Sequence, residues 1–311
     1  MAARRWVAVI AAIAVAGALA ERAKGQVFRS QVELVQVAVT VTDRDGRLVT
    51  TLNRDDFTIT EDATPQTVAL LSRERLPVSL GILVDISDSM FGKRIEDARA
   101  ALDRFVLDLL APTDEAFLMV FNHAPRLISG WTFPPRGLAR HLDEVKPNGG
   151  TAIYDAVATA IPLLTTRRFP RCGFVIVSDG QDNSSDHTLY DAVRALVPTD
   201  AFVYAIAIDE PSGPAIARRF APQALNDLTG PTGGYTEVIG VSGDLEAATE
   251  RIANELNHQY MLAYVPSHGG ADGRYHSIRV RVKSGNYLVR ARRGYVDAPG
   301  RWGRSGAPAA R

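Results

Sequence analysis

The sequence predicts an α/β fold in which a doubly wound, mainly parallel sheet with helices on both faces is inserted between two halves of a small β-sandwich. Apolar runs alternate with helix-period segments over residues 77–257, and strands of two-residue period occupy residues 26–76 and return over residues 258–297. With 311 residues, 46% of them hydrophobic and 23% charged, the chain is long enough for more than one core. Wholesale disorder is therefore excluded.

Residues 1–25 have the pattern of a signal peptide. Two arginines precede the apolar run Trp6–Ala20, which is shorter than the ~20 residues that a membrane-spanning helix needs. Small residues near Ala20 and near Gly25 offer two cleavage sites. We therefore expect a protein exported to the periplasm or the cell exterior, without a spanning segment after signal removal. The alternative is an anchor formed by an uncleaved N-terminal helix.

Residues 26–76 are predicted to form the first half of the β-sandwich. The valines at positions 35, 37, 39 and 41 fall on one face of a strand, as expected for a half-buried strand. Asp45-Gly46 is typical of a hairpin turn. About four strands are expected here, too few to close a core alone.

Residues 77–257 are predicted to form the inserted α/β domain. Continuous apolar strands indicate a parallel sheet covered on both faces, with ligands expected at the carboxyl ends of the strands. The expected strands are Val78–Val84, Phe117–Phe121, Cys172–Val177 and Phe202–Ile208, and the expected helices are Lys93–Leu110, Thr151–Leu164, Thr188–Leu196 and Asp244–Leu256.

Residues 258–297 are predicted to supply the second half of the β-sandwich, with strands at Gln259–Val265, Tyr275–Lys283 and Tyr287–Arg293. Residues 298–311, rich in Gly, Pro, Ala and Arg, are expected to be a disordered tail.

Basic residues cluster between Arg274 and Arg293, where no Asp or Glu occurs. Docking to an anionic surface is one interpretation. The preferred one is a solvated sheet face whose charge the acidic residues of the first β half compensate.

Polar residues with oxygen side chains follow the first predicted strand. In the turn after it, Asp85, Ser87 and Ser89 alternate and can present a carboxylate and two hydroxyls to one point. Such hard oxygens suit Mg²⁺, Mn²⁺ or Ca²⁺ better than zinc or copper. Two further loops converge on the same sheet edge: a Gly-Gly-Thr segment ending at Thr151, and Ser-Asp-Gly around Asp179.

The ordered set D-x-S-x-S, G-G-T and S-D-G resembles the metal-ion-dependent adhesion site of von Willebrand factor A-type domains. The resemblance implies that Ser87, Ser89 and Thr151 bind a divalent cation through hydroxyl oxygens, and that Asp85 and Asp179 bind it directly or through water. Mg²⁺ is the expected ion, with Mn²⁺ or Ca²⁺ possible. It also implies a protein partner that presents an Asp or Glu carboxylate to the ion.

The flanking segments are similar to bacterial exported proteins labelled VWFA-related, in motifs such as Val32–Val37 and Arg290–Tyr295. We therefore expect an adhesion or binding protein rather than an enzyme, with no nucleic-acid partner. The alternative from another class is a metal-independent structural or assembly component of a cell-envelope complex.

A hydrolase remains a third alternative, although the sequence lacks G-x-S-x-G, H-E-x-x-H and phosphate-loop motifs. The 35 basic residues equal the 35 acidic ones, so net charge indicates no class of partner.

The single Cys172 excludes an internal disulfide and is expected to be buried and inert. The six histidines show no ligand spacing, and each is expected on the surface or in a loop. The polar stretch from Asp179 to Asp186 is interpreted as a solvated loop beside the metal site.

Overall fold

The computed structural model describes residues 34–143, 145–178, 181–208, 215–240, 244–268 and 272–297. The predicted signal peptide and C-terminal tail, and the predicted ligand Asp179, lie outside these residues. None of the helices in this part of the chain combines the length and the apolar character that a bilayer crossing requires.

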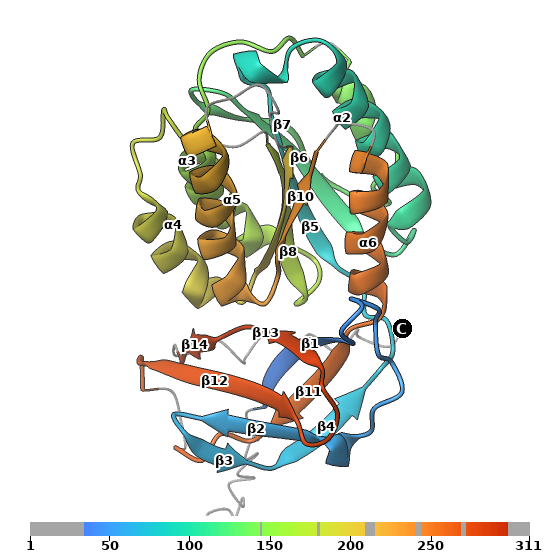
Figure 1. The fold of residues 1–311 in the computed structure, drawn as a ribbon, viewed down its shortest axis with the longest axis vertical. Coiled ribbons are helices and arrows are strands. Elements are labelled where there is room, and N and C mark those ends of the chain that lie inside the picture. Colours follow the sequence, from blue (N-terminus) through green and yellow to red (C-terminus); the bar gives the residue numbers. More distant parts are fainter. Residues whose placement is uncertain are drawn as a thin grey trace, which may run out of the picture. The chain divides into compact units, whose positions relative to one another are not determined.

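The predicted parallel sheet is present in the described part of the chain, where it contains six strands in the order β10-β9-β8-β5-β6-β7 (Figure 1). Five of these strands are parallel, and β7 runs antiparallel at the edge beside β6. The strands are β5 (Ser79–Asp85), β6 (Glu115–Phe121), β7 (Pro125–Thr132), β8 (Cys172–Ser178), β9 (Phe202–Ile208) and β10 (Thr236–Ile239). Every residue of β5, β6, β8 and β9 is buried, which explains their continuous apolar runs.

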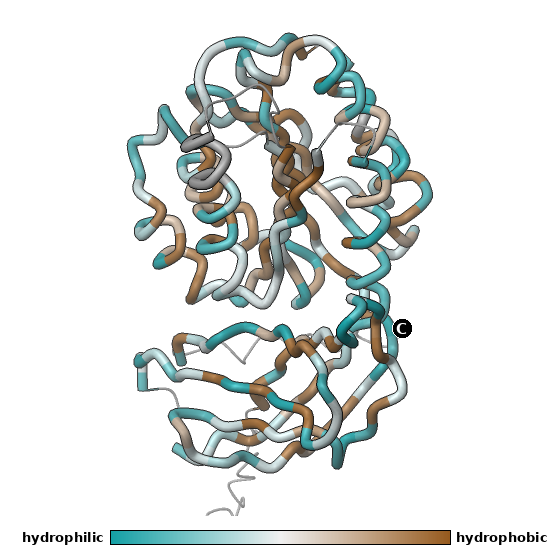
Figure 2. Tube along the Cα trace, in the orientation of Figure 1, coloured by the Kyte–Doolittle hydropathy of each residue, from teal (hydrophilic) through white to brown (hydrophobic). Residues whose placement is uncertain are grey.

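Helices cover both faces of this sheet. On one face, α2 (Lys93–Arg104) and α6 (Leu245–Asn257) contribute to one apolar core (Figure 1). On the other, α3 (Ile153–Ala160), α4 (Leu189–Leu196) and α5 (Ala215–Thr229) contribute to a second core. The predicted doubly wound α/β fold is thus confirmed. Figure 2 shows the apolar residues concentrated in the central strands.

Strands from the two ends of the chain pair with each other in two further sheets, each with four strands among the described residues. Valines 35, 37, 39 and 41 of β1 are at most 1% exposed and share a core with Tyr260 and Tyr264 of β11. One sheet has the order β13 (Leu288–Ala291), β1 (Val35–Thr42), β11 (Tyr260–Tyr264), β4 (Val68–Ser72); the other has the order β14 (Gly294–Val296), β12 (Tyr275–Val282), β2 (Phe57–Glu61), β3 (Thr64–Gln66).

Three elements of the α/β region were not expected from the sequence. Edge strand β7 lacks an apolar run because all of its residues are half-buried or exposed. Helix α5 contains Pro222, a residue that normally ends a helix, and β10 spans only four residues. The predicted helix Lys93–Leu110 is also shorter than expected: α2 ends at Arg104, and Phe105–Leu109 forms a π-helical turn.

A buried carboxylate connects α6 to the central sheet and to one of the sheets formed by the two ends of the chain. The Glu255 Oε1 atom accepts hydrogen bonds of 2.8 Å from the hydroxyls of Thr40 in β1 and Tyr204 in β9. Its Oε2 atom accepts a hydrogen bond from the guanidinium of Arg290 in β13. Since α6 ends at Asn257 and β11 begins at Tyr260, this contact lies close to the passage from helix to strand.

Candidate functional site

The site lies at the carboxyl ends of β5 and β8, where the winding of the sheet reverses. From β5 the chain continues to β6 on one side, and from β8 it continues to β9 on the other. Crevices at such reversals are where open α/β sheets bind ligands. The first predicted ligand, Asp85, is the last residue of β5.

The Asp85 carboxylate is fully buried and fixed by hydrogen bonds to both of its oxygens. Its Oδ1 atom accepts the Ser87 backbone N–H at 2.8 Å, and its Oδ2 atom accepts the Ser178 hydroxyl at 2.6 Å. Ser178 ends β8, so the two neighbouring strands orient one carboxylate. Sequence analysis missed this role of Ser178, although its place directly before Asp179 indicated the same loop.

The hydroxyl oxygens of Ser87 and Ser89 lie 2.9 Å apart. Ser87 is 2% exposed, and the short helical turn Asp88–Met90 follows it. The two hydroxyls are therefore neighbours, although Ser89 lies in a helical turn and not in the extended segment that the predicted alternation assumed. Adjacent oxygen ligands in an octahedral Mg²⁺ shell with bonds of about 2.1 Å lie about 3 Å apart. The separation of the two hydroxyls fits this requirement.

A second loop brings Thr151 against the first. The Asn148 N–H donates to the Ile86 carbonyl at 2.8 Å, and the Asp88 N–H donates to the Gly149 carbonyl at 2.9 Å. Gly149 has a φ of +78°, a backbone conformation that favours glycine. Thr151 follows and is 4% exposed. The backbone thus joins the loops of Ser87 and Thr151 as the sequence predicted.

The third loop holds Thr151 through Asn183 and Ser184, two residues whose role sequence analysis missed. The Thr151 N–H donates to Asn183 Oδ1 at 2.9 Å, and the Thr151 carbonyl accepts the N–H groups of Asn183 and Ser184. A Cβ atom on Gly150 would lie 2.1 Å from the Ser184 hydroxyl oxygen, so glycine is required for this contact.

Asp182 of the same loop accepts the Tyr154 N–H, at 3.0 Å, near the start of α3. The stretch interpreted as a solvated loop therefore supports the loop of Thr151. The sequence signal for this supporting role was the group of hydrogen-bonding residues, Asp182 and Asn183 among them, that follows the predicted ligand Asp179.

The oxygen atoms that the described site residues could offer as metal ligands fit a hard divalent cation. They comprise one buried, oriented carboxylate from Asp85 and the hydroxyls of Ser87, Ser89 and Thr151, all of them oxygen ligands. Oxygen-only sets of this kind favour Mg²⁺, Mn²⁺ or Ca²⁺.

A second group of titratable residues lies in the β region, the two four-stranded sheets formed by the ends of the chain, where the expectation of a surface or loop position is wrong for His276. His276 is 6% exposed because it lies on the inward face of β12. Its Nδ1 atom lies 2.8 Å from the Asp62 carboxylate and its Nε2 atom 3.1 Å from that of Asp272. Burial opposes charge on the ring, but the hydrogen bonds and charges of Asp272 and Asp62 outweigh it and raise the pKa of His276. The His268 ring stacks on it with centroids 4.0 Å apart.

These two histidines are poorly placed to bind one metal ion together. A metal bound by an imidazole nitrogen lies close to the plane of its ring. The planes of His268 and His276 are within 9° of parallel, so one ion cannot lie in both. Both nitrogens of His276 also have carboxylate partners. We therefore interpret the cluster as a buried ion-pair network.

Comparison with known proteins identifies a domain family in the central part of the chain. The model of the von Willebrand factor type A domain matches residues 80–181. The inter-alpha-trypsin inhibitor heavy chain H2 of Sus scrofa is 29% identical over 98 residues, which are 30% of this chain and 10% of that protein. This chain therefore corresponds to about a tenth of that relative's length.

Solved structures include similar chains, of which the first below shares the fold. A von Willebrand factor type A protein from Catenulispora acidiphila is similar with a TM-score of 0.50 and 13% identity, over 88% of this chain and 76% of that one. The vWF domain of the type V pili tip protein Mfa5 from Porphyromonas gingivalis has a TM-score of 0.46 and 15% identity, over 59% and 96% of the two chains. The family match shows that residues 80–181 of this chain belong to a von Willebrand factor type A domain.

Proposed function

We propose that this protein binds a carboxylate of a protein partner through a divalent cation, most naturally Mg²⁺, held by Asp85, Ser87, Ser89, Thr151 and Asp179. The observation that carries the proposal is the geometry around Asp85. A buried carboxylate oriented at both oxygens adjoins two hydroxyl oxygens that lie 2.9 Å apart.

The residues of the site divide the work between charge and position. Asp85 contributes a negative charge that its hydrogen bonds to Ser87 and Ser178 keep in one orientation. Ser87, Ser89 and Thr151 contribute neutral oxygens, which neutralise little of a cation's charge. A divalent cation, when bound, supplies positive charge and a coordination position open to an incoming carboxylate. This division favours capture of an acidic group.

A binding role agrees better with the chain than a catalytic one, because the sequence lacks the G-x-S-x-G, H-E-x-x-H and phosphate-loop motifs. We further propose that the protein acts outside the cytoplasm, on the basis of the apolar run Trp6–Ala20. Adhesion and assembly of envelope structures are both roles in which a partner is captured there.

A thermal melt of the purified protein tests the cation site. We expect chelator to lower the melting temperature and added Mg²⁺, Mn²⁺ or Ca²⁺ to restore it. A cation at ~100 times its Kd should add ~2.7 kcal/mol of stability to the folded state. For a domain of this size, that corresponds to a rise of roughly 5–10 °C.

Two variants make the test specific. Asp85→Ala should abolish the cation-dependent increment, whatever it does to stability without metal. Asp88→Ala, which removes an exposed carboxylate three residues further along, should retain it. An equal increment in all three proteins would disprove the assignment of the site. No increment at millimolar metal would favour the metal-independent assembly component instead.

A further inference from the structure

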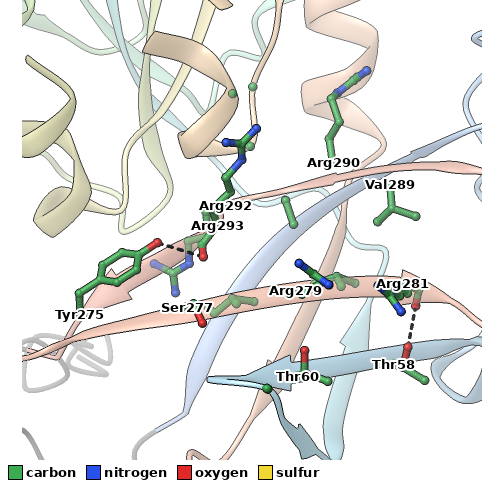
Figure 3. A pocket seen from close by; sticks show the side chains of 17 residues that line it. Thr58, Thr60, Tyr275, Ser277, Arg279, Arg281, Val289, Arg290, Arg292 and Arg293 are labelled. Carbon is green, nitrogen blue, oxygen red and sulfur yellow. Dashed lines mark hydrogen bonds between the residues drawn. The ribbon is translucent and has the colours of Figure 1, made fainter. Parts of the chain in front are cut away.

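A groove of about 900 Å³, whose charged lining residues are all arginines, lies between strands β2, β12 and β13 on one side and the turn of Gly230, Gly233 and Gly234, which follows α5, on the other (Figure 3). The described residues that line it include no Asp or Glu. Thr58 and Thr60 on β2 and Ser277 on β12 add hydroxyls to the lining, and Tyr275 lies at one end. The five arginines are Arg279, Arg281, Arg290, Arg292 and Arg293.

Two of these arginines already have carboxylate partners. Arg290 pairs with Glu255 and Arg292 pairs with Asp200. Within the described residues, Arg279, Arg281 and Arg293 form no ion pair, and all three are exposed. Because a guanidinium stays protonated at any physiological pH, the groove carries three positive charges available to a ligand.

The expected solvated face is present, since Arg279 and Arg281 are exposed, but the acidic residues of the first β half form no ion pair with these arginines among the described residues. The strand register explains why. In the register of β12 against β2, Arg279 lies opposite Thr60 and Arg281 lies opposite Thr58. Threonines therefore occupy the neighbouring positions on that face of β2. The acidic residues of the first β half have other partners: Asp45 pairs with Arg47, and Asp62 with His276. Glu61 is buried and accepts the Tyr295 hydroxyl at 3.0 Å.

The spacing of the arginines indicates the form of the ligand. Arg279 and Arg281 are two residues apart on one exposed face of β12, which places their Cα atoms about 7 Å apart. An extended peptide repeats its side chains on one face at this same distance. Each guanidinium can bind a carboxylate through two parallel hydrogen bonds. Acidic side chains at every second position of an extended peptide would therefore match the strand.

Other polyanions fit the lining less well. Single-stranded nucleic acids are bound by series of aromatic rings on which bases stack. Tyr275 is the one aromatic residue among the described residues of the lining, and its hydroxyl donates to the Arg293 carbonyl at 3.1 Å. We propose that this groove binds an extended acidic segment of a protein partner, at a site separate from Asp85, with Arg279 and Arg281 as its main anchors.

Fluorescence anisotropy with defined peptides tests the proposal. The probe is a labelled heptapeptide with glutamate at every second position and serine between. One comparison peptide has the same composition with its glutamates adjacent, and another has glutamine in their place. Chelator is present throughout, so that cation binding near Asp85 does not contribute. We expect the alternating peptide to bind more tightly than the block peptide, and the glutamine peptide not to bind.

Arginine variants locate the binding. Arg279→Gln/Arg281→Gln should weaken the alternating peptide roughly tenfold or more, because two charge-assisted contacts are lost. Arg126→Gln/Arg194→Gln removes the same charge from exposed positions elsewhere and should stay within about twofold. Asp85→Ala should bind the peptide like the wild type.

Three results would overturn the proposal. The first is an equal loss in both double variants, which would indicate bulk electrostatics. The second is no preference for the alternating peptide over the block peptide. The third is tighter binding of a sulfated polysaccharide or of single-stranded DNA that depends on the same Arg279 and Arg281, because this would assign the groove to a different class of polymer.

Discussion

Replacing Glu255 by alanine removes the carboxylate on which three groups converge. Thr40 and Tyr204 donate their hydroxyl protons to Glu255 Oε1, each at 2.8 Å, and Arg290 donates to Oε2. Burial first, and then the charge of Glu255, raises the pKa of Tyr204, so its hydroxyl remains a donor. The Glu255 side chain is only 5% exposed, and water cannot readily take its place.

The expected loss follows from the partners left behind. Gln259 Nε2 continues to donate to the Thr40 and Tyr204 hydroxyls, at 3.2 and 3.1 Å, but neither hydroxyl keeps its acceptor. The Arg290 side chain, 23% exposed, loses its counter-charge. Removing one partner of a buried ion pair costs about 3–5 kcal/mol, so we expect the free energy of unfolding to fall by that amount. The melting temperature should fall by roughly 10 °C.

Urea unfolding followed by circular dichroism measures this loss. Glu255→Gln, which keeps the shape but not the charge, should lie between the wild type and Glu255→Ala. Glu250→Ala is the matched control, because Glu250 is on the same helix but its side chain is 58% exposed. Its ion pair with Arg104 is long at 3.8 Å and therefore weak. It should change stability by at most about 1 kcal/mol. If Glu255→Ala matched Glu250→Ala, the network would contribute no net stability and the reasoning would be refuted.

Three further predictions concern pH, the lone thiol and helix α6. Because the pKa of folded His276 is raised, its ion pairs stabilise the protein fully below the unfolded-state pKa of about 6.5, and this stability is lost as pH rises through the folded pKa. Unfolding in urea between pH 5.5 and 9 should therefore show a smaller loss in His276→Gln than in wild type or His141→Gln, and equal losses would contradict it. Burial raises the pKa of Cys172 to about 11, so a thiol reagent at pH 8 should label it only after denaturation, and rapid native labelling would exclude this placement. Since α6 leads almost directly into β11, filling the cation site should alter amide exchange over residues 244–265 in wild type but not in Asp85→Ala. Unchanged exchange with the site filled would disprove this coupling.

The sequence predicted those parts of the fold that rest on a strong local pattern. Continuous apolar runs located β5, β6, β8 and β9 to within two residues at either end, because strands buried on both faces require apolar residues throughout. Edge strand β7 and the Pro222-containing helix α5 were missed, since their formation depends on tertiary contacts that override the local sequence.

For the candidate site, the sequence pattern indicated which residues to propose as metal ligands. It did not indicate the residues that fix those side chains and loops by hydrogen bonds. Asp85, Ser87 and Ser89 follow a strand end and share a recognisable spacing. Ser178 and Asn183 support the site across distances of 93 and 32 residues along the chain, and no local pattern encodes such contacts. The same limit explains the histidines: His276 contacts Asp62 from 214 residues away.

Strand β12 shows how one alternation determines both packing and surface chemistry. His276, Ile278 and Val280 point inward, whereas Arg279 and Arg281 point outward. A slip of one residue against β2 would exchange the two sets. It would bury both guanidinium groups without partners, at a cost of several kcal/mol each, and expose two apolar side chains. The apolar core therefore enforces the register that places Arg279 opposite Thr60 rather than beside an acidic residue. The uncompensated charge of the groove is thus a consequence of how the β-sandwich packs.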